Sequence, residues 1–187
     1  GQSLLATAGL PGAVREALSA SASSRPARVA IVRCTAYDAS VKSALKKSFD
    51  LLGGVGTLVS GKTVAIKINL TGTNFAPFLG RPVGETYMTH ESTALALVAI
   101  LFEEGARRVR FLESTQSRSS LESSLGLADW DLGTIRALGK VEFENTRNLG
   151  SAKHYSDLKV PDGGRMFSAL SLNHSYADTD VLISLAK

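Results

Sequence analysis

Residues 63–70 read TVAIKINL, and this run of β-branched and aliphatic side chains predicts a strand. On its amino-terminal side, apolar residues recur three and four apart over residues 41–52, which predicts a helix that two glycines end. On the other side, Thr89 is the predicted N-cap of a helix that runs to Glu104, and residues 109–112 predict the next strand. Strands that alternate with helices in this way favour an α/β fold in three layers, with a mostly parallel sheet and helices on both faces.

The rest of the sequence continues this alternation. We expect a single α/β domain over residues 28–187, preceded by a tail with a short helix and a linker over residues 1–27. The other expected elements are a strand at 28–34, a helix at 125–138, a strand at 141–143, a small hairpin at 158–170, a helical turn at 172–177 and a final strand at 179–187.

The composition excludes several classes of protein. Hydrophobic residues make up 44% and charged residues 20% of the 187 residues, which excludes disorder as the main state. The net charge of +4 is spread along the chain and aromatic residues are only 6%, so the concentrated basic stripe of a nucleic-acid-binding protein is missing from the sequence. No apolar run is long enough to span a bilayer. The single cysteine, Cys34, excludes a disulfide framework, and its position in an apolar run predicts a packed core thiol.

The two ends of the sequence indicate a longer natural protein. Gly1 stands where Met is expected, so we expect that a leader was removed and that the protein is exported, for example to the periplasm; a cytoplasmic location is the alternative. The last predicted strand reaches Lys187 without a cap or a tail, so we expect the domain to be truncated there. The sequence leaves the oligomeric state open.

Residues 56–63 read GTLVSGKT and match the phosphate-binding pattern G-x-x-x-x-G-K-[ST]. That pattern binds phosphate where a strand precedes it and a helix follows it, because the helix N-terminus supplies N–H donors and a favourable dipole. Here the predicted helix at 41–52 precedes the glycines and the predicted strand at 63–70 follows them. We therefore interpret the segment as a helix-to-strand loop, and nucleotide binding would need a helix that begins at Lys62.

Ligands of parallel α/β proteins bind outside the carboxyl ends of the strands, so the polar residues there form the candidate site. His90 and Glu113 are the candidate catalytic residues, because each can transfer a proton. Lysine, asparagine and hydroxyl side chains beside a helix N-terminus would hold a carboxylate or a phosphate. The three histidines have no metal-ligand spacing, so no metal site is predicted. The candidate ligand-binding residues are Lys67, Asn69, Thr89, Ser114 and Lys187.

Each candidate also has a structural interpretation. Lys67 alternates with apolar neighbours and fits the solvated face of a strand. Thr89 fits a helix cap. Glu113 fits an ordinary ion-pair partner of Arg107 or Arg110.

Three of these segments resemble motifs of domain-of-unknown-function family 362. They are GKTVAIKINL at residues 61–70, Thr89-His90 at the next helix, and GARRV at residues 105–109. In that family a strand reads G-K-x-V-x-I-K-P-N, a helix begins with T-H-P, and a later strand ends in P-K-x-K-x-H, whose first lysine Lys187 matches.

The resemblance extends over residues 29–187, and it departs from the family at Ile68, Glu91 and Ala186, which stand in place of prolines. It implies a bacterial or archaeal protein of uncharacterised biochemistry, often with an iron–sulfur segment and sometimes with an export signal. A cluster needs four thiolates and this chain has one cysteine, so an iron–sulfur cluster is not possible within this chain alone, and no other cofactor is evident.

Three functional hypotheses follow. The first is a protein that binds a small anionic molecule at the carboxyl ends of the strands, as a redox-associated enzyme. The second is a non-catalytic, exported module that binds a small molecule in the same place. The third is a nucleotide-binding protein that uses residues 56–63. A closed pocket with a strongly shifted pKa at His90 or Glu113 would favour the enzyme, and an open cradle for an anion would favour the binding module.

Overall fold

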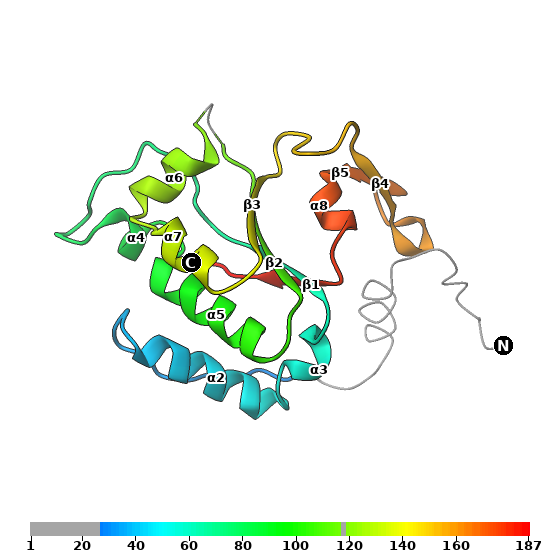
Figure 1. The fold of residues 1–187 in the computed structure, drawn as a ribbon. Coiled ribbons are helices and arrows are strands. Elements are labelled where there is room, and N and C mark those ends of the chain that lie inside the picture. Colours follow the sequence, from blue (N-terminus) through cyan, green and yellow to red (C-terminus); the bar gives the residue numbers. More distant parts are fainter. Residues whose placement is uncertain (1–26, 117–118) are drawn as a thin grey trace.

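The computed structural model of the chain describes residues 27–116 and 119–187. The predicted tail and short helix fall almost entirely outside these ranges. Four strands pair in parallel in the order β3-β2-β1-β6, and a separate antiparallel pair consists of β4 and β5 (Figure 1), so the predicted α/β class and the predicted hairpin are confirmed. The strands are β1 (Thr63–Lys67), β2 (Arg108–Glu113), β3 (Val141–Asn145), β4 (Ser156–Lys159), β5 (Ala169–Leu172) and β6 (Val181–Ser184).

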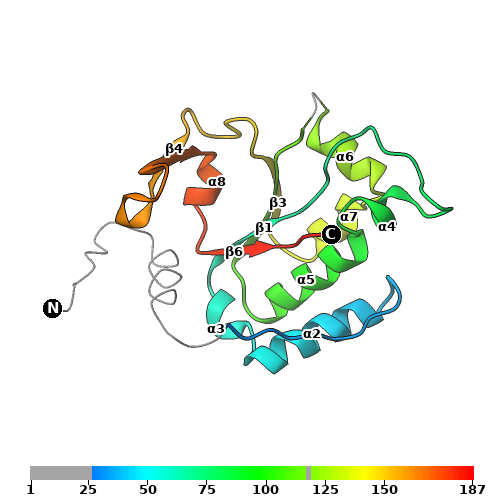
Figure 2. The same cartoon turned by 180° about the vertical axis from the view of Figure 1, so that it is seen from behind.

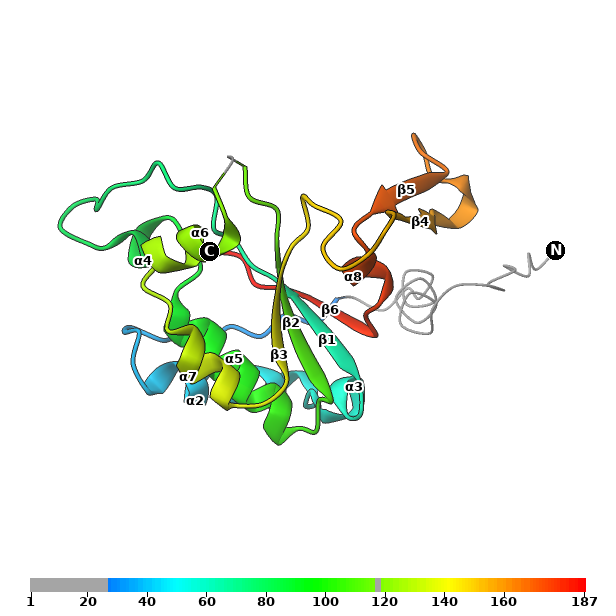
Figure 3. The ribbon, with the colours of Figure 1, turned by 45° about the horizontal axis from the view of Figure 1, so that its top comes forward.

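The longer helices lie on one side of the parallel sheet. Figure 3 shows α5 and α7 on that side with α2 farther out, and the β4–β5 hairpin and α8 on the opposite side. The view from behind in Figure 2 shows β6 above α5 and α2 below it. The helices are α2 (Ser40–Leu52), α3 (Gly56–Val59), α4 (Val83–Thr86), α5 (Glu91–Glu103), α6 (Leu121–Leu127), α7 (Leu132–Ala137) and α8 (His174–Ala177), and the 3-10 turn Pro161–Gly163 lies inside the hairpin.

Side chains alternate across the sheet, and every second position faces α5 and α7. These positions are apolar in all four strands, and those of β1 and β2 are fully buried. Phe111 stacks on Phe143 with ring centroids 5.2 Å apart and meets Trp130 edge-on at 5.4 Å. Burial of one such side chain contributes about 1.5–3 kcal/mol, so this face holds the core. Two rows of side chains run across this face of the sheet. One row consists of Val64, Val109, Val141 and Val181, and the next consists of Ile66, Phe111, Phe143 and Ile183.

The opposite face of the sheet is charged. Arg110 in β2 lies in register with Glu142 in β3, and its Nε donates to that carboxylate at 2.9 Å. Glu144 lies two residues farther along β3, on the same face. The short helix α8 and the loop after β3 cover part of this face, where they line a cavity with both strands.

The predicted first strand, residues 28–34, is wrong, because this segment pairs with no strand in the described part of the chain. Val29 is 80% and Ile31 is 90% exposed, and Arg28 donates from Nη1 to the carbonyl of Leu52 at the end of α2. β1 pairs with β2 on one side and with β6 on the other, so β6 takes the place beside β1 that a strand at 28–34 could have taken. Cys34 is exposed in this segment, so the predicted core thiol is wrong as well.

Two helix predictions need smaller corrections. The predicted helix at 125–138 is two helices, α6 and α7, which are separated at Asp129 by a left-handed backbone with φ of 58°. The N-cap of α5 is His90 rather than Thr89, because the His90 side chain accepts the N–H of Ser92. Residues 56–63 are only partly a loop, because Gly56–Val59 form α3; β1 begins at Thr63, so no helix begins at Lys62.

Candidate ligand site at the carboxyl ends of the strands

Glu113 ends β2 and is the centre of the first group of predicted site residues. Its side chain is 6% exposed, and its Oε1 accepts from Lys67 Nζ at 2.6 Å. Oε1 also accepts from the backbone N–H of Ser114 at 2.7 Å, and Oε2 accepts from that of Leu70 at 2.6 Å. Three donors therefore hold this carboxylate, and it ties the loop after β1 to the end of β2. Its ion-pair partner is Lys67 and neither of the two arginines considered from the sequence.

Thr89 joins a second group at the end of β1. Its Oγ1 accepts from the N–H of Asn69 at 2.9 Å and lies 3.2 Å from the carbonyl of Leu185, which follows β6. The Thr89 N–H donates to the Asn69 carbonyl at 2.8 Å, and its own carbonyl accepts from Trp130 Nε1 at 3.1 Å. Thr89 is buried and its polar groups bond to the protein itself, so it stabilises the junction of three segments.

His90 begins α5 and stacks on Tyr37. The two ring centroids are 3.8 Å apart and the rings are inclined by 11°. Nδ1 accepts the Ser92 N–H at 3.1 Å, so in the neutral imidazole the proton is on Nε2. Burial lowers the pKa of His90, and the positive charge of Lys187 lowers that pKa further. His90 is therefore neutral near pH 7 and offers an N–H donor.

Lys187 meets the same tyrosine from the other end of the chain. Its Nζ donates to Tyr37 Oη at 3.0 Å and to the carbonyl of Gly84 at 3.1 Å. The ammonium also lies 5.0 Å from the centre of the Tyr37 ring. Because Lys187 follows β6 and His90 begins α5, Tyr37 brings a predicted strand-end lysine and a predicted helix-start histidine to one place.

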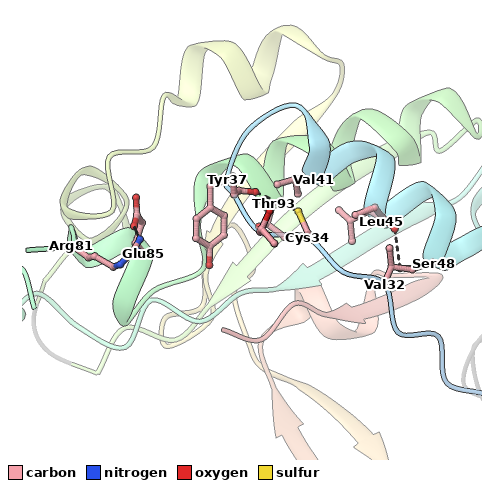
Figure 4. Close-up of a pocket in the computed structure, with 12 residues that line it drawn as sticks. Val32, Cys34, Tyr37, Val41, Leu45, Ser48, Arg81, Glu85 and Thr93 are labelled. Atoms are coloured by element: carbon pink, nitrogen blue, oxygen red, sulfur yellow. Dashed lines mark hydrogen bonds and ion pairs between the residues drawn. The ribbon is translucent and has the colours of Figure 1, made fainter. Parts of the chain in front are cut away.

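A cavity of about 510 Å³ opens beside Tyr37. Figure 4 shows Tyr37 on its wall between two groups of lining residues, with Arg81 and Glu85 on one side and Cys34 on the other. Arg81 Nη1 and Glu85 Oε2 form an ion pair at 2.7 Å. The aliphatic part of the lining comes from α2 and the segment before it, namely Val32, Val41, Ala44 and Leu45.

The predicted site residues thus form two groups. One group consists of Lys67, Glu113 and the Ser114 N–H. In the other group, Thr89 bonds to Asn69 and precedes His90 in the sequence, and Tyr37 contacts both His90 and Lys187. Within residues 27–116 and 119–187, no hydrogen bond or ion pair joins His90 to Glu113. The two candidate proton-transfer groups therefore do not form one catalytic pair in this structure.

Sequence reasoning missed Tyr37, Arg81 and Glu85. The strand-end rule does not find Tyr37, because the run 28–34 before it forms no strand. Arg81 and Glu85 are four residues apart, the spacing of an ion pair on one helical turn. The intervening glycine and proline pattern favoured a plain loop instead.

Among the residues that the structure describes, no group of three or more His, Cys, Asp or Glu side chains is placed to hold a metal ion. None of the helices in this part of the chain has the length and apolar character needed to cross a bilayer.

Comparison with protein-family models, with curated proteins and with solved structures gives no match to this chain. The resemblance to domain-of-unknown-function family 362 therefore stays a prediction.

Proposed function

We propose that this chain binds a small anionic molecule, a carboxylate or a phosphate, in the cavity beside Tyr37. The observation that carries the proposal is that Lys187 and His90 both contact Tyr37, and that Tyr37 in turn lines a cavity of about 510 Å³. A volume of this size suits a small organic molecule.

Lys187 supplies the positive charge. An ammonium group has three N–H donors, and the bonds to Tyr37 and Gly84 use two of them. The third donor can bond to an anion without breaking either contact. Those same two contacts fix the position of the ammonium, which reduces the entropy lost when a ligand binds.

His90 supplies a neutral N–H donor beside the same tyrosine. Its Nδ1 accepts the Ser92 N–H, so Nε2 carries the proton in the neutral ring. The lowered pKa keeps the ring neutral near pH 7, and it avoids a second positive charge beside Lys187. One cation and one neutral N–H donor match a singly charged carboxylate or phosphate oxygen.

Arg81 and Glu85 give the cavity selectivity. Their ion pair lies at 2.7 Å on the wall opposite the apolar residues from α2. If a ligand has a second negative group, that group would replace the Glu85 carboxylate as the ion-pair partner of Arg81. A ligand with an apolar body would contact Val41 and Leu45. We therefore infer a small amphiphilic acid as the preferred class.

Binding is favoured over catalysis at this place. Glu113 was the sequence candidate for a general base, and its oxygens accept from Lys67, Leu70 and Ser114. All three donors are groups of the protein itself, so this carboxylate is held in place by the loop after β1 and the end of β2. We assign it a structural role and assign no reaction to this site. Export of the protein and an association with iron–sulfur chemistry stay predictions.

Calorimetric titration with three probes tests the proposal: inorganic phosphate, acetate and hexanoate, each at constant ionic strength. We expect saturable binding of at least one probe, with hexanoate bound more tightly than acetate. Lys187→Met and His90→Gln should each weaken binding about tenfold, which corresponds to about 1.4 kcal/mol. Lys153→Met is the matched control, because Lys153 is an exposed lysine outside the cavity.

Two results would overturn the proposal. One is the absence of saturable heat with all three probes. The other is an equal loss of affinity in Lys153→Met and Lys187→Met, which would indicate general attraction to the net charge of the chain rather than a site.

A further inference from the structure

Ser151, His174 and Asp178 line one cavity on the charged face of the sheet, far in sequence from the residues of the cavity beside Tyr37. We propose that they form a nucleophile, a general base and an orienting carboxylate, and that they hydrolyse small activated carboxylic esters. The proposal concerns a second site and is independent of the anion site proposed above.

The geometry of the three side chains carries the proposal. Ser151 Oγ is 3.2 Å from His174 Nε2, and His174 Nδ1 is 3.3 Å from Asp178 Oδ2. The serine and the carboxylate therefore contact opposite nitrogens of one imidazole, the arrangement in which the carboxylate fixes the tautomer that can accept a proton from serine. The His174 side chain is 14% exposed, so the ring is held, whereas Ser151 lies at the surface where a substrate can reach it.

One buried side chain positions both parts of this arrangement. Asn173 is 2% exposed, and its Oδ1 accepts the N–H of Ser175 at 2.8 Å, which caps the helix that carries His174. Its Nδ2 donates to the carbonyl of Asn148 at 2.7 Å, in the loop that carries Ser151. The serine loop and the histidine helix are therefore fixed relative to each other by a single amide.

Glu144 reinforces the loop. Asn173 Nδ2 also donates to Glu144 Oε1 at 3.1 Å, and this carboxylate packs against Gly150, the residue before the serine. Gly150 has a φ of 60°, and a Cβ built there would lie 1.4 Å from Glu144 Oε1. Glu144 Oε1 is 3.6 Å from His174 Nε2, farther than Ser151 Oγ. The serine is thus the nearer partner of that nitrogen.

The three side chains line a cavity that also contains two arginines. Arg108 and Arg110 belong to its wall, and Glu142 forms ion pairs with both. Arg110 is nearly buried, and its Nη1 makes no hydrogen bond within the described residues. Glu142 balances the charge of the arginines, so this wall of the cavity is polar without being net positive.

The chemistry needs only the ester and water. Ser151 Oγ attacks the carbonyl carbon while His174 Nε2 takes the hydroxyl proton. The bond from that carbon to the leaving oxygen breaks, and the leaving alcohol takes the proton from Nε2. Water then attacks the acyl-serine, again with proton transfer through Nε2, so the carboxylic acid is released and Ser151 regains its hydrogen. Asp178 keeps its charge throughout and acts as a positioning residue.

Two measurements on the full chain test the proposal. The first is release of p-nitrophenol from p-nitrophenyl acetate, and the second is mass-spectrometric mapping of a fluorophosphonate adduct. We expect the adduct on Ser151. Ser151→Ala and His174→Gln should each lower the rate at least about 100-fold. Ser168→Ala and His154→Gln are matched controls with exposed residues outside the cavity, and should keep the wild-type rate.

Substitutions of Asp178 test whether its negative charge contributes to the reaction. Its side chain is 63% exposed, so substitution leaves the fold intact, and we expect Asp178→Asn to lower kcat about tenfold without changing KM. Asp178→Glu should restore most of the rate, a rescue that a merely structural role would not give. The proposal is overturned if Ser151→Ala hydrolyses the ester as fast as the wild type, or if the adduct forms on another residue. Unchanged kinetics in Asp178→Asn would overturn the three-residue arrangement.

Discussion

Lys67 and Glu113, 46 residues apart in the sequence, meet at 2.6 Å where β1 and β2 end side by side. The lysine is half-buried and the glutamate is buried, so the pair lies at the boundary between the core and the candidate ligand site. Because the glutamate also accepts two backbone N–H groups, the pair fixes the loop after β1 on the end of β2.

We expect Glu113→Gln to lower the free energy of unfolding by about 3 kcal/mol. The substitution keeps the size of the side chain but places an amide NH2 among donors that need acceptors. Lys67→Met should cost less, because the carboxylate keeps its two backbone donors. Chemical denaturation measures both, and Glu122→Gln on the exposed side of α6 is the control. Equal stability of Glu113→Gln and Glu122→Gln would contradict the structural role of Glu113.

Thr89→Val should lower the free energy of unfolding by about 2 kcal/mol, whereas Thr89→Ser should lower it by less than half as much. Valine has the shape of threonine but leaves the Asn69 N–H and the Leu185 carbonyl without their bonds to Oγ1. Serine keeps the hydroxyl. Thermal unfolding followed by circular dichroism distinguishes the two variants, and the reverse order would show that the methyl group matters more than the hydrogen bonds.

Gly150→Ala should destabilise the protein more than Gly61→Ala. Both glycines have a left-handed backbone, with φ of 60° and 71°, so each alanine costs about 1 kcal/mol in backbone strain. A Cβ at Gly61 meets nothing within 4 Å, whereas one at Gly150 requires Glu144 to leave its bond with Asn173. Comparison of the two unfolding free energies isolates the contact, and equal losses would mean that Glu144 moves aside without cost.

His90 should make the protein less stable as the pH falls below about 6.5. Its folded-state pKa is lower than the ordinary value, so the unfolded chain binds the proton more tightly than the folded chain. The stabilisation by neutral His90 is therefore present above the unfolded pKa and is lost as the pH falls through the folded pKa. The carboxylates titrate mainly below about pH 5.

The unfolding free energy measured between about pH 5 and pH 8 gives this slope. His90→Gln should flatten it, while the two other histidines remain in both proteins. A slope that is unchanged in His90→Gln would assign the pH dependence to those residues instead.

Local patterns in the sequence predicted most of the fold. The run TVAIKINL became β1, the periodic segment at 41–52 became most of α2, and Pro161 to Gly164 marked the turn of the hairpin. These elements are determined by residues that are close together in the sequence, so their pattern can be recognised from the sequence alone.

Long-range pairing decided what the local patterns could not. The run at 28–34 has the composition of a strand, but β6 from the other end of the chain pairs with β1. Trp130 donates from Nε1 to the carbonyl of Thr89, 41 residues away, a contact that no local pattern predicts. The strand-end rule placed Lys67 and Glu113 together correctly, but it could not divide the candidate residues into two groups, because this division depends on Tyr37.

The amide of Asn173 has a consequence for the motions of the molecule. The loop around Asn148 and the first turn of α8 both depend on that one side chain, so neither can open without breaking hydrogen bonds that hold the other. The two segments, which are about 25 residues apart in sequence, should therefore open as one cooperative unit and exchange their amide hydrogens at matched rates. Residues 28–34, without a strand partner, should exchange much faster than either.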